Sequence, residues 1–256
     1  MVERTHYPNA PITEALIDLR ITHAQDFSVD DLGKMGESIA DRYPIQEPMY
    51  FHSGQVAFQQ AEDPVQVETT HEHVGFRFIS QNKQQILQAR RDGFTFSILA
   101  PYDRWETFRD EAHRLWELYR SAAKVENITR MAVRYINRID VPIATTPIVR
   151  VEDFLRTYPV IPSDWPYEDL HSYFMQLQIP QVDLGGMMVI NQATAPPPNP
   201  ETTSILLDFD LFRTQYEEPW PVDNDAAVWA FLEQLHDRKN EYFEGSITDR
   251  TRGLMR

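Results

Sequence analysis

The chain has 256 residues, of which 42% are hydrophobic, so it can bury a sizeable core, and disorder is excluded as its main state. Lysine and arginine number 24 against 39 aspartates and glutamates, which gives a formal net charge of -15. A negatively charged protein repels the phosphate backbones of nucleic acids and the surfaces of anionic membranes. The charge therefore excludes a general nucleic-acid binder.

The sequence contains no cysteine, which excludes disulfides, cysteine nucleophiles and thiolate metal sites. No stretch approaches the roughly 18 apolar residues that a membrane span needs. The first twenty residues also lack the basic and apolar regions of a signal peptide. We expect a cytoplasmic protein that does not associate with membranes and uses no cofactor.

The chain begins with the pattern of a half-buried strand followed by a helix. In PITEALIDLRI, the apolar residues Ala15, Ile17 and Leu19 recur at every second position, which is the period of a strand. Ser28 is suited to cap a helix over SVDDLGKMGESIADRY, because its hydroxyl can accept a hydrogen bond from an amide of the first turn. Pro44 ends that helix.

Four extended segments and a second helix complete the first half. The extended segments are predicted at residues 50–60, 65–80, 84–90 and 94–99. The tripeptide Arg91-Asp92-Gly93 between the last two is typical of a hairpin turn. The helix is predicted over PYDRWETFRDEAHRLWELYRSAA, whose apolar stripe consists of Trp105, Phe108, Ala112, Leu115, Trp116 and Tyr119.

The second half repeats this order of elements. A strand over ITRMAVRYINRIDVP is followed by a short helix over VEDFLRTY, then by three extended segments and a long helix. The extended segments are predicted near residues 170–179, 184–191 and 203–214, and the helix over residues 225–244. Because the halves share little residue identity, the repeat is one of pattern.

This order predicts an α+β fold with a mainly antiparallel, curved sheet and long helices on one face. We expect two pseudo-repeated β-α-β(3-4)-α units, residues 1–125 and 126–256, that share one continuous sheet or core. The topology resembles the TATA-binding-protein-like arrangement, in which two such units form one long sheet, and also the helix-grip arrangement. No sequence motif of either family is present.

Three arginines in the second half fall on one strand face. Arg130, Arg134 and Arg138 are spaced by four, opposite an apolar face. If the first strands of the two halves pair antiparallel, one register places Glu14 opposite Arg138 and Asp18 opposite Arg134, with apolar residues meeting on the other face. We interpret the arginines as counter-charges of the first strand.

The alternative interpretation is that the arginines line a groove on the concave sheet face. Guanidinium groups suit bidentate contacts with carboxylate or phosphate. Arg77 and Arg90 could join Arg130, Arg134 and Arg138 in such a groove, although no feature of the sequence places them there.

Clusters that resemble metal or catalytic sites are few. His71 and His73 would share a strand face and could chelate one ion, but two ligands do not make a site, and we expect no metal. Asp208 and Asp210 also share a strand face, which we interpret as the solvated side of the strand. His236 is predicted to be an isolated surface or helix-packing residue.

The segments PNAPITEALIDLR, GFRFIS and ITRMAVRYINRIDVP together resemble a sporadically distributed family of uncharacterised prokaryotic proteins of about this length. The resemblance covers most of the first 142 residues. It implies a bacterial or archaeal source, and the family carries no assigned activity, so no catalytic residue is implied.

No phosphate-binding glycine loop and no serine-nucleophile motif occurs in the sequence. With a large sheet, an acidic field and no catalytic constellation, we expect a non-enzymatic protein-binding or accessory module, of the antitoxin or defence-associated kind, with a protein partner or a second copy of itself. The alternative is a small-anion-binding protein or a hydrolase that uses the arginine-lined groove.

Overall fold

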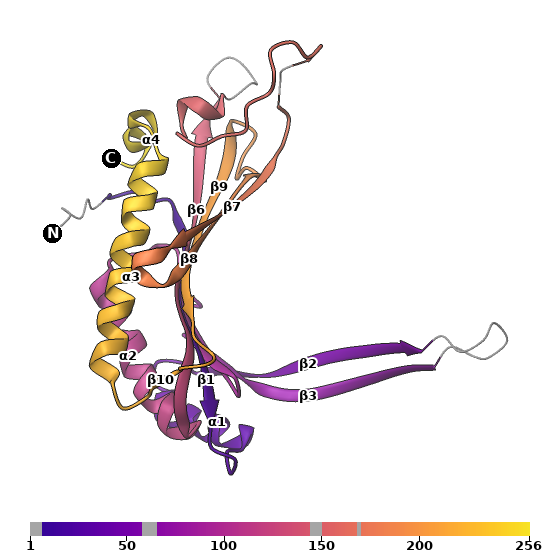
Figure 1. Cartoon of the computed structure of the whole chain (residues 1–256), viewed down its shortest axis with the longest axis vertical. Coiled ribbons are helices and arrows are strands. Elements are labelled where there is room, and N and C mark those ends of the chain that lie inside the picture. Colours follow the sequence, from indigo (N-terminus) through magenta and orange to yellow (C-terminus); the bar gives the residue numbers. More distant parts are fainter. Residues whose placement is uncertain (1–6, 58–65, 144–149, 168–169) are drawn as a thin grey trace.

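The computed structural model describes residues 7–57, 66–143, 150–167 and 170–256. In these ranges ten strands form one antiparallel sheet in the order β2-β3-β4-β5-β1-β6-β9-β8-β7, with β10 paired to β6 (Figure 1). The long helices α2 and α3 lie on the same face of the curved sheet (Figure 1). The predicted α+β class with a mainly antiparallel sheet is therefore confirmed.

The elements follow the predicted order closely. The first half contains β1 (Ile12–His23), α1 (Val29–Met35), the 3-10 helix η1 (Gly36–Ile39), β2 (Ile45–Ala57), β3 (Gln66–Ile79), β4 (Gln85–Arg90), β5 (Gly93–Leu99) and α2 (Trp105–Ala122). The second half contains β6 (Val125–Pro142), η2 (Val151–Asp153), β7 (Phe174–Gln181), η3 (Val182–Leu184), β8 (Gly186–Ala195), β9 (Thr202–Thr214), β10 (Trp220–Pro221), α3 (Asp225–Ser246) and α4 (Asp249–Leu254).

Local signals placed most of these elements. The Ser28 hydroxyl accepts a hydrogen bond from the amide of Asp30, so the predicted cap of α1 is confirmed. The predicted helix over VEDFLRTY is wrong, because only a short 3-10 turn forms there. Phe154 and Leu155 are buried, and Leu155 bridges to Ile247 beyond the end of α3, so tertiary packing overrides the local preference.

The strands β1 and β6 pair at the middle of the sheet, as predicted, but the predicted register is wrong by two residues. Ile17 lies opposite Val133, and Leu19 lies opposite Met131. A shift of two residues leaves every side chain on its own face, so the apolar alternation fits both registers equally well. Expected charge pairs decided the predicted register, and those pairs do not form.

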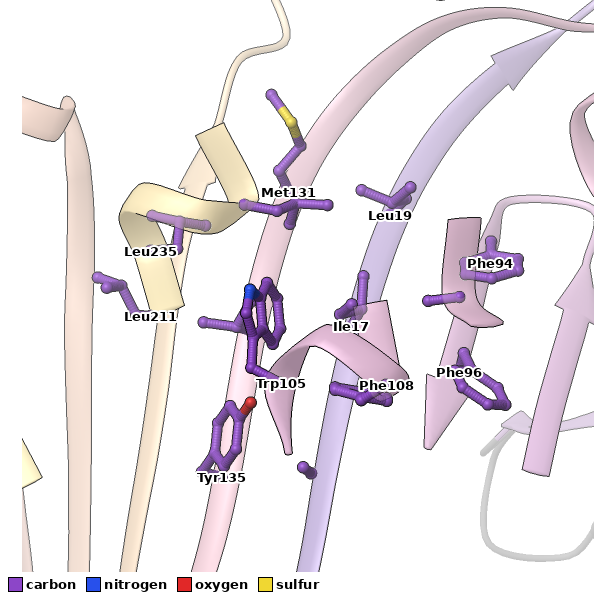
Figure 2. Packing of buried hydrophobic residues seen from close by; sticks show 14 of the residues in the cluster. Ile17, Leu19, Phe94, Phe96, Trp105, Phe108, Met131, Tyr135, Leu211 and Leu235 are labelled. Carbon is purple, nitrogen blue, oxygen red and sulfur yellow. The ribbon is translucent and has the colours of Figure 1, made fainter. Parts of the chain in front are cut away.

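One contiguous core lies between the sheet and the two long helices. It joins both halves of the chain, because β1 and β6 contribute side chains to the same layer. Figure 2 shows this layer with the labelled residues Ile17, Leu19, Phe94, Phe96, Trp105, Phe108, Met131, Tyr135, Leu211 and Leu235. Full burial of one such side chain contributes roughly 1.5–3 kcal/mol, so this layer is the main source of stability.

The outer parts of β2 and β3 leave the sheet as a two-stranded ribbon, which we define as Tyr50–Ala57 and Gln66–Val74. β4 pairs with β3 only from Gly75 onward, so beyond that point β2 and β3 pair with each other. A bulge marks the departure, since the register shifts between Met49 and Tyr50. The ribbon projects from the side of the sheet opposite α2 and α3 (Figure 1).

Candidate functional site

The face of the sheet opposite α2 and α3, here the open face, carries a network of arginines and aspartates. Asp18 on β1 is only 5% exposed. It accepts hydrogen bonds from Arg130 at 2.6 Å, from Arg20 at 3.2 Å, from Arg90 at 3.3 Å and from the Thr95 hydroxyl at 2.7 Å. Four side chains from β1, β4, β5 and β6 therefore converge on one buried carboxylate.

The electrostatics of Asp18 follow from this arrangement. Burial by itself would raise the pKa of Asp18, but the guanidinium groups of Arg20, Arg130 and Arg90, with the Thr95 hydroxyl, hold it below its ordinary value. Asp18 is therefore ionised at neutral pH and serves as the counter-charge of the arginines around it.

A second part of the network lies between β6 and β9. Arg134 donates two hydrogen bonds to Asp208, at 2.8 and 2.7 Å, and Asn191 donates a third at 3.0 Å. Asp210 accepts from Arg130 at 3.3 Å through both carboxylate oxygens. Burial raises the pKa of Asp210 despite the nearby Arg130 and Arg134. Asp208 and Asp210 thus belong to a largely buried network and are not the solvated strand face that the sequence pattern predicted.

The remaining predicted arginines lie apart from this network. Arg138 bonds Asp140 on its own strand, with its Nε 3.0 Å from Oδ1, and Ser204 donates to the same oxygen at 2.5 Å. Arg77 on β3 pairs with Glu47 on β2. Because β3 and β6 are four strands apart in the sheet, roughly 19 Å separates them. The predicted arginines therefore do not all line one groove.

Both predicted charge pairs of the central strands are wrong. Glu14 lies opposite Ile136 and not opposite Arg138, and Asp18 lies opposite Ala132 and not opposite Arg134. Of the three arginines, only Arg130 is a counter-charge of the first strand, through Asp18, whereas Arg134 pairs with Asp208 on β9 and Arg138 with Asp140 on β6 itself.

This pairing limits what the open face can do chemically. The groove along it is lined by Asp18, Arg20, Arg90, Arg130 and Asp210, among others. An anionic ligand would have to displace an internal carboxylate from each guanidinium that it used, and buried charge pairs lose several kcal/mol when one partner is removed. The geometry therefore favours a structural role for the arginines.

A cavity of about 240 Å³ on the helix side was missed by the sequence analysis. It is lined by the segment before β1, the start of α2, the middle of α3 and one residue of β6. Three of its lining side chains are polar yet buried, namely Asn137, His236 and Lys239. Charged residues, among them Asp103, Arg104 and Glu106, also line the cavity beside apolar ones. A cavity with a few buried polar groups is a candidate small-molecule site.

The geometry in this cavity is well defined. The ring of His236 stacks on Trp105 with centroids 4.2 Å apart and planes 6° apart. The ammonium of Lys239 lies 3.6 Å above the centroid of the Tyr135 ring, and the hydroxyls of Tyr135 and Tyr102 are 3.0 Å apart. One signal could have found the site, because His236 and Lys239 continue the apolar stripe of α3, where residues face the core.

Two groups of side chains among the described residues offer ligand atoms within 4.8 Å of one another, as metal sites require. One group is His113, Glu117 and Asp225, and the other is Glu233, His236 and Asp237. Several of these atoms already have partners. His113 bonds Asp225 at 2.8 Å, and Glu233 accepts from the Trp105 indole at 2.6 Å. Contacts between α2 and α3 account for this arrangement.

The predicted pair His71 and His73 lies on the ribbon, and Glu72 between them forms an ion pair with Arg91 at the β4–β5 turn. The structure adds a third histidine, because His52 lies directly opposite His71 in the ribbon. Sequence spacing could not reveal this neighbour, since 18 residues separate the two positions along the chain.

No protein-family model matches the chain, and no curated protein matches its sequence. Within the described ranges, none of the helices has the length and apolar character that a bilayer span requires.

Proposed function

We propose that this protein is a non-enzymatic protein-binding module that receives its partner on the open face, between two projecting groups of exposed apolar side chains. The observation that carries this proposal is the ribbon. A two-stranded hairpin is marginally stable in water on its own, and it normally needs further strands or a packed face. The ribbon nevertheless extends away from the body of the protein (Figure 1).

Exposed aromatic side chains lie at the base of the ribbon. Tyr50 is 53% exposed and Phe51 is 58% exposed. They point to opposite faces, because successive residues of a strand alternate. Phe51 lines a hollow together with Arg90 and Arg91 of the neighbouring turn. An aromatic ring beside such a hollow is the kind of anchor that dominates protein interfaces.

The other end of the sheet carries a second exposed apolar group. Its members lie between η2 and the start of β7, and they are Tyr158, Val160, Trp165, Tyr167, Leu170 and Phe174. Tyr167 is 87% exposed and Phe174 is 70% exposed. This segment also extends toward the side opposite the helices (Figure 1). The concentration of large apolar side chains in one exposed segment favours a contact surface.

The charge of the chain restricts the partner. At a net charge of -15, two copies repel each other, whereas a partner with a basic rim would be drawn to the protein by electrostatic steering. We therefore propose a protein partner with an apolar centre and a basic rim. The arginines of the open face already pair with carboxylates, so they add no strong attraction for an acidic partner.

Site-specific photocrosslinking in cells of the source organism tests this function. A photoreactive amino acid replaces Phe51, Tyr167 or, as the control, Gln234, which is exposed on α3 on the helix side. We expect the first two positions to crosslink the same protein and the control position not to do so. The captured protein is then purified and titrated against the wild type and the Phe51→Asp variant. We expect the Phe51→Asp variant to bind it at least tenfold more weakly than the wild type does.

Equal adducts from all three positions, or no weakening by Phe51→Asp, would contradict the proposal. Crosslinks between two copies of the chain, supported by a dimer in sedimentation, would assign the same surface to self-association.

A second candidate function is favoured by the helix-side cavity, which is lined by the buried polar side chains of Asn137, His236 and Lys239. A small molecule with an apolar body and one or two polar groups would suit it. Native mass spectrometry of the freshly purified protein tests this candidate. A reproducible excess mass that disappears in the Trp105→Ala variant and persists in Arg134→Ala would support it, and a clean mass would count against it.

We also propose that the two halves are pseudo-repeated units that meet between residues 125 and 126, in the manner of the TATA-binding-protein-like arrangement. The strand order supports this proposal. β5 lies beside β1 and β9 lies beside β6, so each half places its last long strand next to its first. Each half also ends in a long helix on the same face. Separate expression of residues 1–125 and 126–256, followed by mixing, tests whether they reassemble.

A further inference from the structure

We propose that the partner protein adds a strand to the sheet, by pairing an extended segment of its own with β7 (Phe174–Gln181). This inference rests on the function proposed above, because it says how the same partner is held. β7 is the last strand in the order of the sheet, and within the described ranges it pairs with β8 alone. The side of β7 that points away from β8, here the outer edge, is therefore the place where a further strand can pair.

The pairing of β7 with β8 shows which backbone groups point to the outer edge. In an antiparallel pair, every second residue exchanges backbone hydrogen bonds with its opposite residue, and the residues between them direct their N–H and C=O groups away from the neighbouring strand. The amide of Thr194 donates to the carbonyl of Tyr173 at 3.1 Å. Tyr173 lies one position before Phe174, which is opposite Ala193. Tyr173 is thus a bonded residue, and Phe174 is an outward one.

Counted from Tyr173, the outward residues of β7 are Phe174, Gln176, Gln178 and Pro180. Pro180 agrees with this count, because a proline lacks an N–H group and is placed in an edge strand with its nitrogen toward solvent. Outside the strands and helices, no backbone hydrogen bond within the described part of the chain uses the other three outward residues. They offer a row of backbone donors and acceptors that only another extended backbone matches in spacing.

The two edges of the sheet differ in how they are protected. Proteins usually guard an exposed edge with charges, prolines or bulges. The other edge strand, β2, carries Glu47 and Pro48, and its register shifts between Met49 and Tyr50. β7 has no charged residue among its 8, and its one proline, Pro180, stands next to its last residue. Most of the outer edge of β7 therefore lacks such a guard, and covering it desolvates no charge.

The side chains of β7 specify the chemistry of the added segment. Leu177 and Ile179 are partly buried and pack against the core on the helix side, whereas Gln176 and Gln178 are exposed on the open face. Neighbouring strands place their side chains on matching faces. The segment should therefore alternate apolar residues, which extend the core layer, with polar residues on the open face.

The position of β7 connects this edge to the proposed contact surface. Phe174 is both the first residue of β7 and a member of the exposed apolar group that precedes it. A partner that covers this group reaches the outer edge directly. A second copy of the chain is the less suitable occupant, because both copies carry a net charge of -15.

A phage library of random dodecapeptides, selected on the full-length wild type, tests the proposal. Gln176→Pro removes one outward N–H group, and Gln176→Ala is the matched control, because both variants lose the side-chain bond to Asn191 while alanine keeps the N–H group. We expect selected peptides with alternating apolar residues to bind Gln176→Pro at least tenfold more weakly and Gln176→Ala about as well as the wild type. Thermal unfolding shows whether both variants are folded.

Hydrogen exchange of the wild type gives a second readout that needs no variant. A bound peptide should slow the exchange of the amides of Gln176 and Gln178, and it should leave the amide of Leu177 unchanged, because that amide already bonds to β8. The proposal is wrong if the selection yields no peptide, if the peptides bind Gln176→Pro as tightly as the wild type, or if these two glutamine amides exchange unchanged.

Two further outcomes separate this inference from the function on which it rests. If Phe51 and Tyr167 crosslink one protein while the edge experiments fail, only the added strand is wrong. If the edge experiments succeed without those crosslinks, the open-face function is wrong and the edge remains a binding site. A dimer of the wild type in sedimentation that Gln176→Pro abolishes would assign the edge to a second copy and would overturn the proposed occupant.

Discussion

The central strands β1 and β6 and the ribbon formed by β2 and β3 are both extended backbone, yet their surroundings differ completely. At the centre, one face of the sheet packs into the core and the other carries the charged network around Asp18. At the base of the ribbon, Tyr50 and Phe51 are exposed on opposite faces. Hydrogen-bonded pairing is enough to form a strand. A strand whose faces are buried by other residues stabilises the fold, whereas a strand whose faces stay exposed is available for binding.

The largest effect is expected where the charged network loses its shared anion. Asp18→Ala should destabilise the protein by roughly 3–5 kcal/mol, because Arg20, Arg90 and Arg130 are left without their common carboxylate in a mostly buried place. Urea unfolding at pH 7 measures this loss. Glu14→Ala on the same strand is the control. Glu14 has no ion pair among the described residues, and we expect its removal to change stability by less than about 0.5 kcal/mol.

The core face of the same strand gives the next effect. Leu19→Ala should cost about 2–5 kcal/mol, because Leu19 is fully buried against its neighbours and leaves a cavity. Thermal unfolding monitored by circular dichroism measures the change. If Leu19→Ala were no more harmful than Tyr50→Ala in the ribbon, the contrast between the two regions would be wrong.

Double-mutant cycles can test the partner of Arg134 on β9 and the register of β1 against β6. Arg134 and Asp208 should show a coupling of about 1 kcal/mol, a modest value because Arg134 is 39% exposed and partly screened by solvent. The pair from the rejected register, Glu14 and Arg138, should show a coupling near zero. A clear coupling for that pair would favour the predicted register over the observed one.

A smaller, pH-dependent effect separates the two aspartates of the open face. The pKa of Asp18 is lowered, so its stabilisation is complete above the unfolded value of roughly 3.9 and is lost as pH falls through the lower folded value. The pKa of Asp210 is raised, so its ionisation removes stability as pH rises above roughly 3.9.

Asp210→Asn should therefore be neutral or slightly stabilising at pH 7, by at most about 1 kcal/mol, and should lose that advantage near pH 4. The free energy of unfolding, measured at both pH values, checks the sign. A marked loss of stability at pH 7 would mean that the charge of Asp210 is needed by Arg130 and Arg134.

The smallest effect on stability is expected at the ribbon. Phe51→Ser should leave the free energy of unfolding within about 0.5 kcal/mol of the wild type, because this ring is more than half exposed. Guanidinium unfolding checks this prediction. A loss above about 2 kcal/mol would place Phe51 in the folded core and would remove the ribbon's role as an exposed contact.

Much of the fold could be predicted because periodicity is a local property. β9 was predicted to within one residue at its start, and the Ser28 cap of α1 and the stripe of α2 were recognised from the same kind of signal. Such patterns report which face of an element is buried, and burial of that face is the dominant stabilising term. The helix predicted over VEDFLRTY does not form, because Leu155 in this segment bridges to Ile247, about 90 residues away, and a local pattern cannot report such a contact.

The candidate sites could be predicted only in part. The sequence placed Arg130, Arg134 and Arg138 on one face of a strand, but it could not show that Asp208 and Asp210 of β9 lie beside Arg134 and Arg130. The helix-side cavity was missed because Lys239 and His236 are common surface residues, and their burial depends on how α2 and α3 meet. His52 could not be joined to His71 without the register of the ribbon.

By itself, the sequence determined the kinds of elements, their order, which faces of the strands are apolar and the acidic character of the whole chain, because each of these depends on neighbouring residues or on composition. Only the tertiary structure decided the register of β1 against β6, the carboxylate that each arginine meets, the cavity under α3 and the projection of the ribbon. A shift of two residues preserves every local pattern while changing every cross-strand partner, so partners are determined only when all the strands and helices pack together.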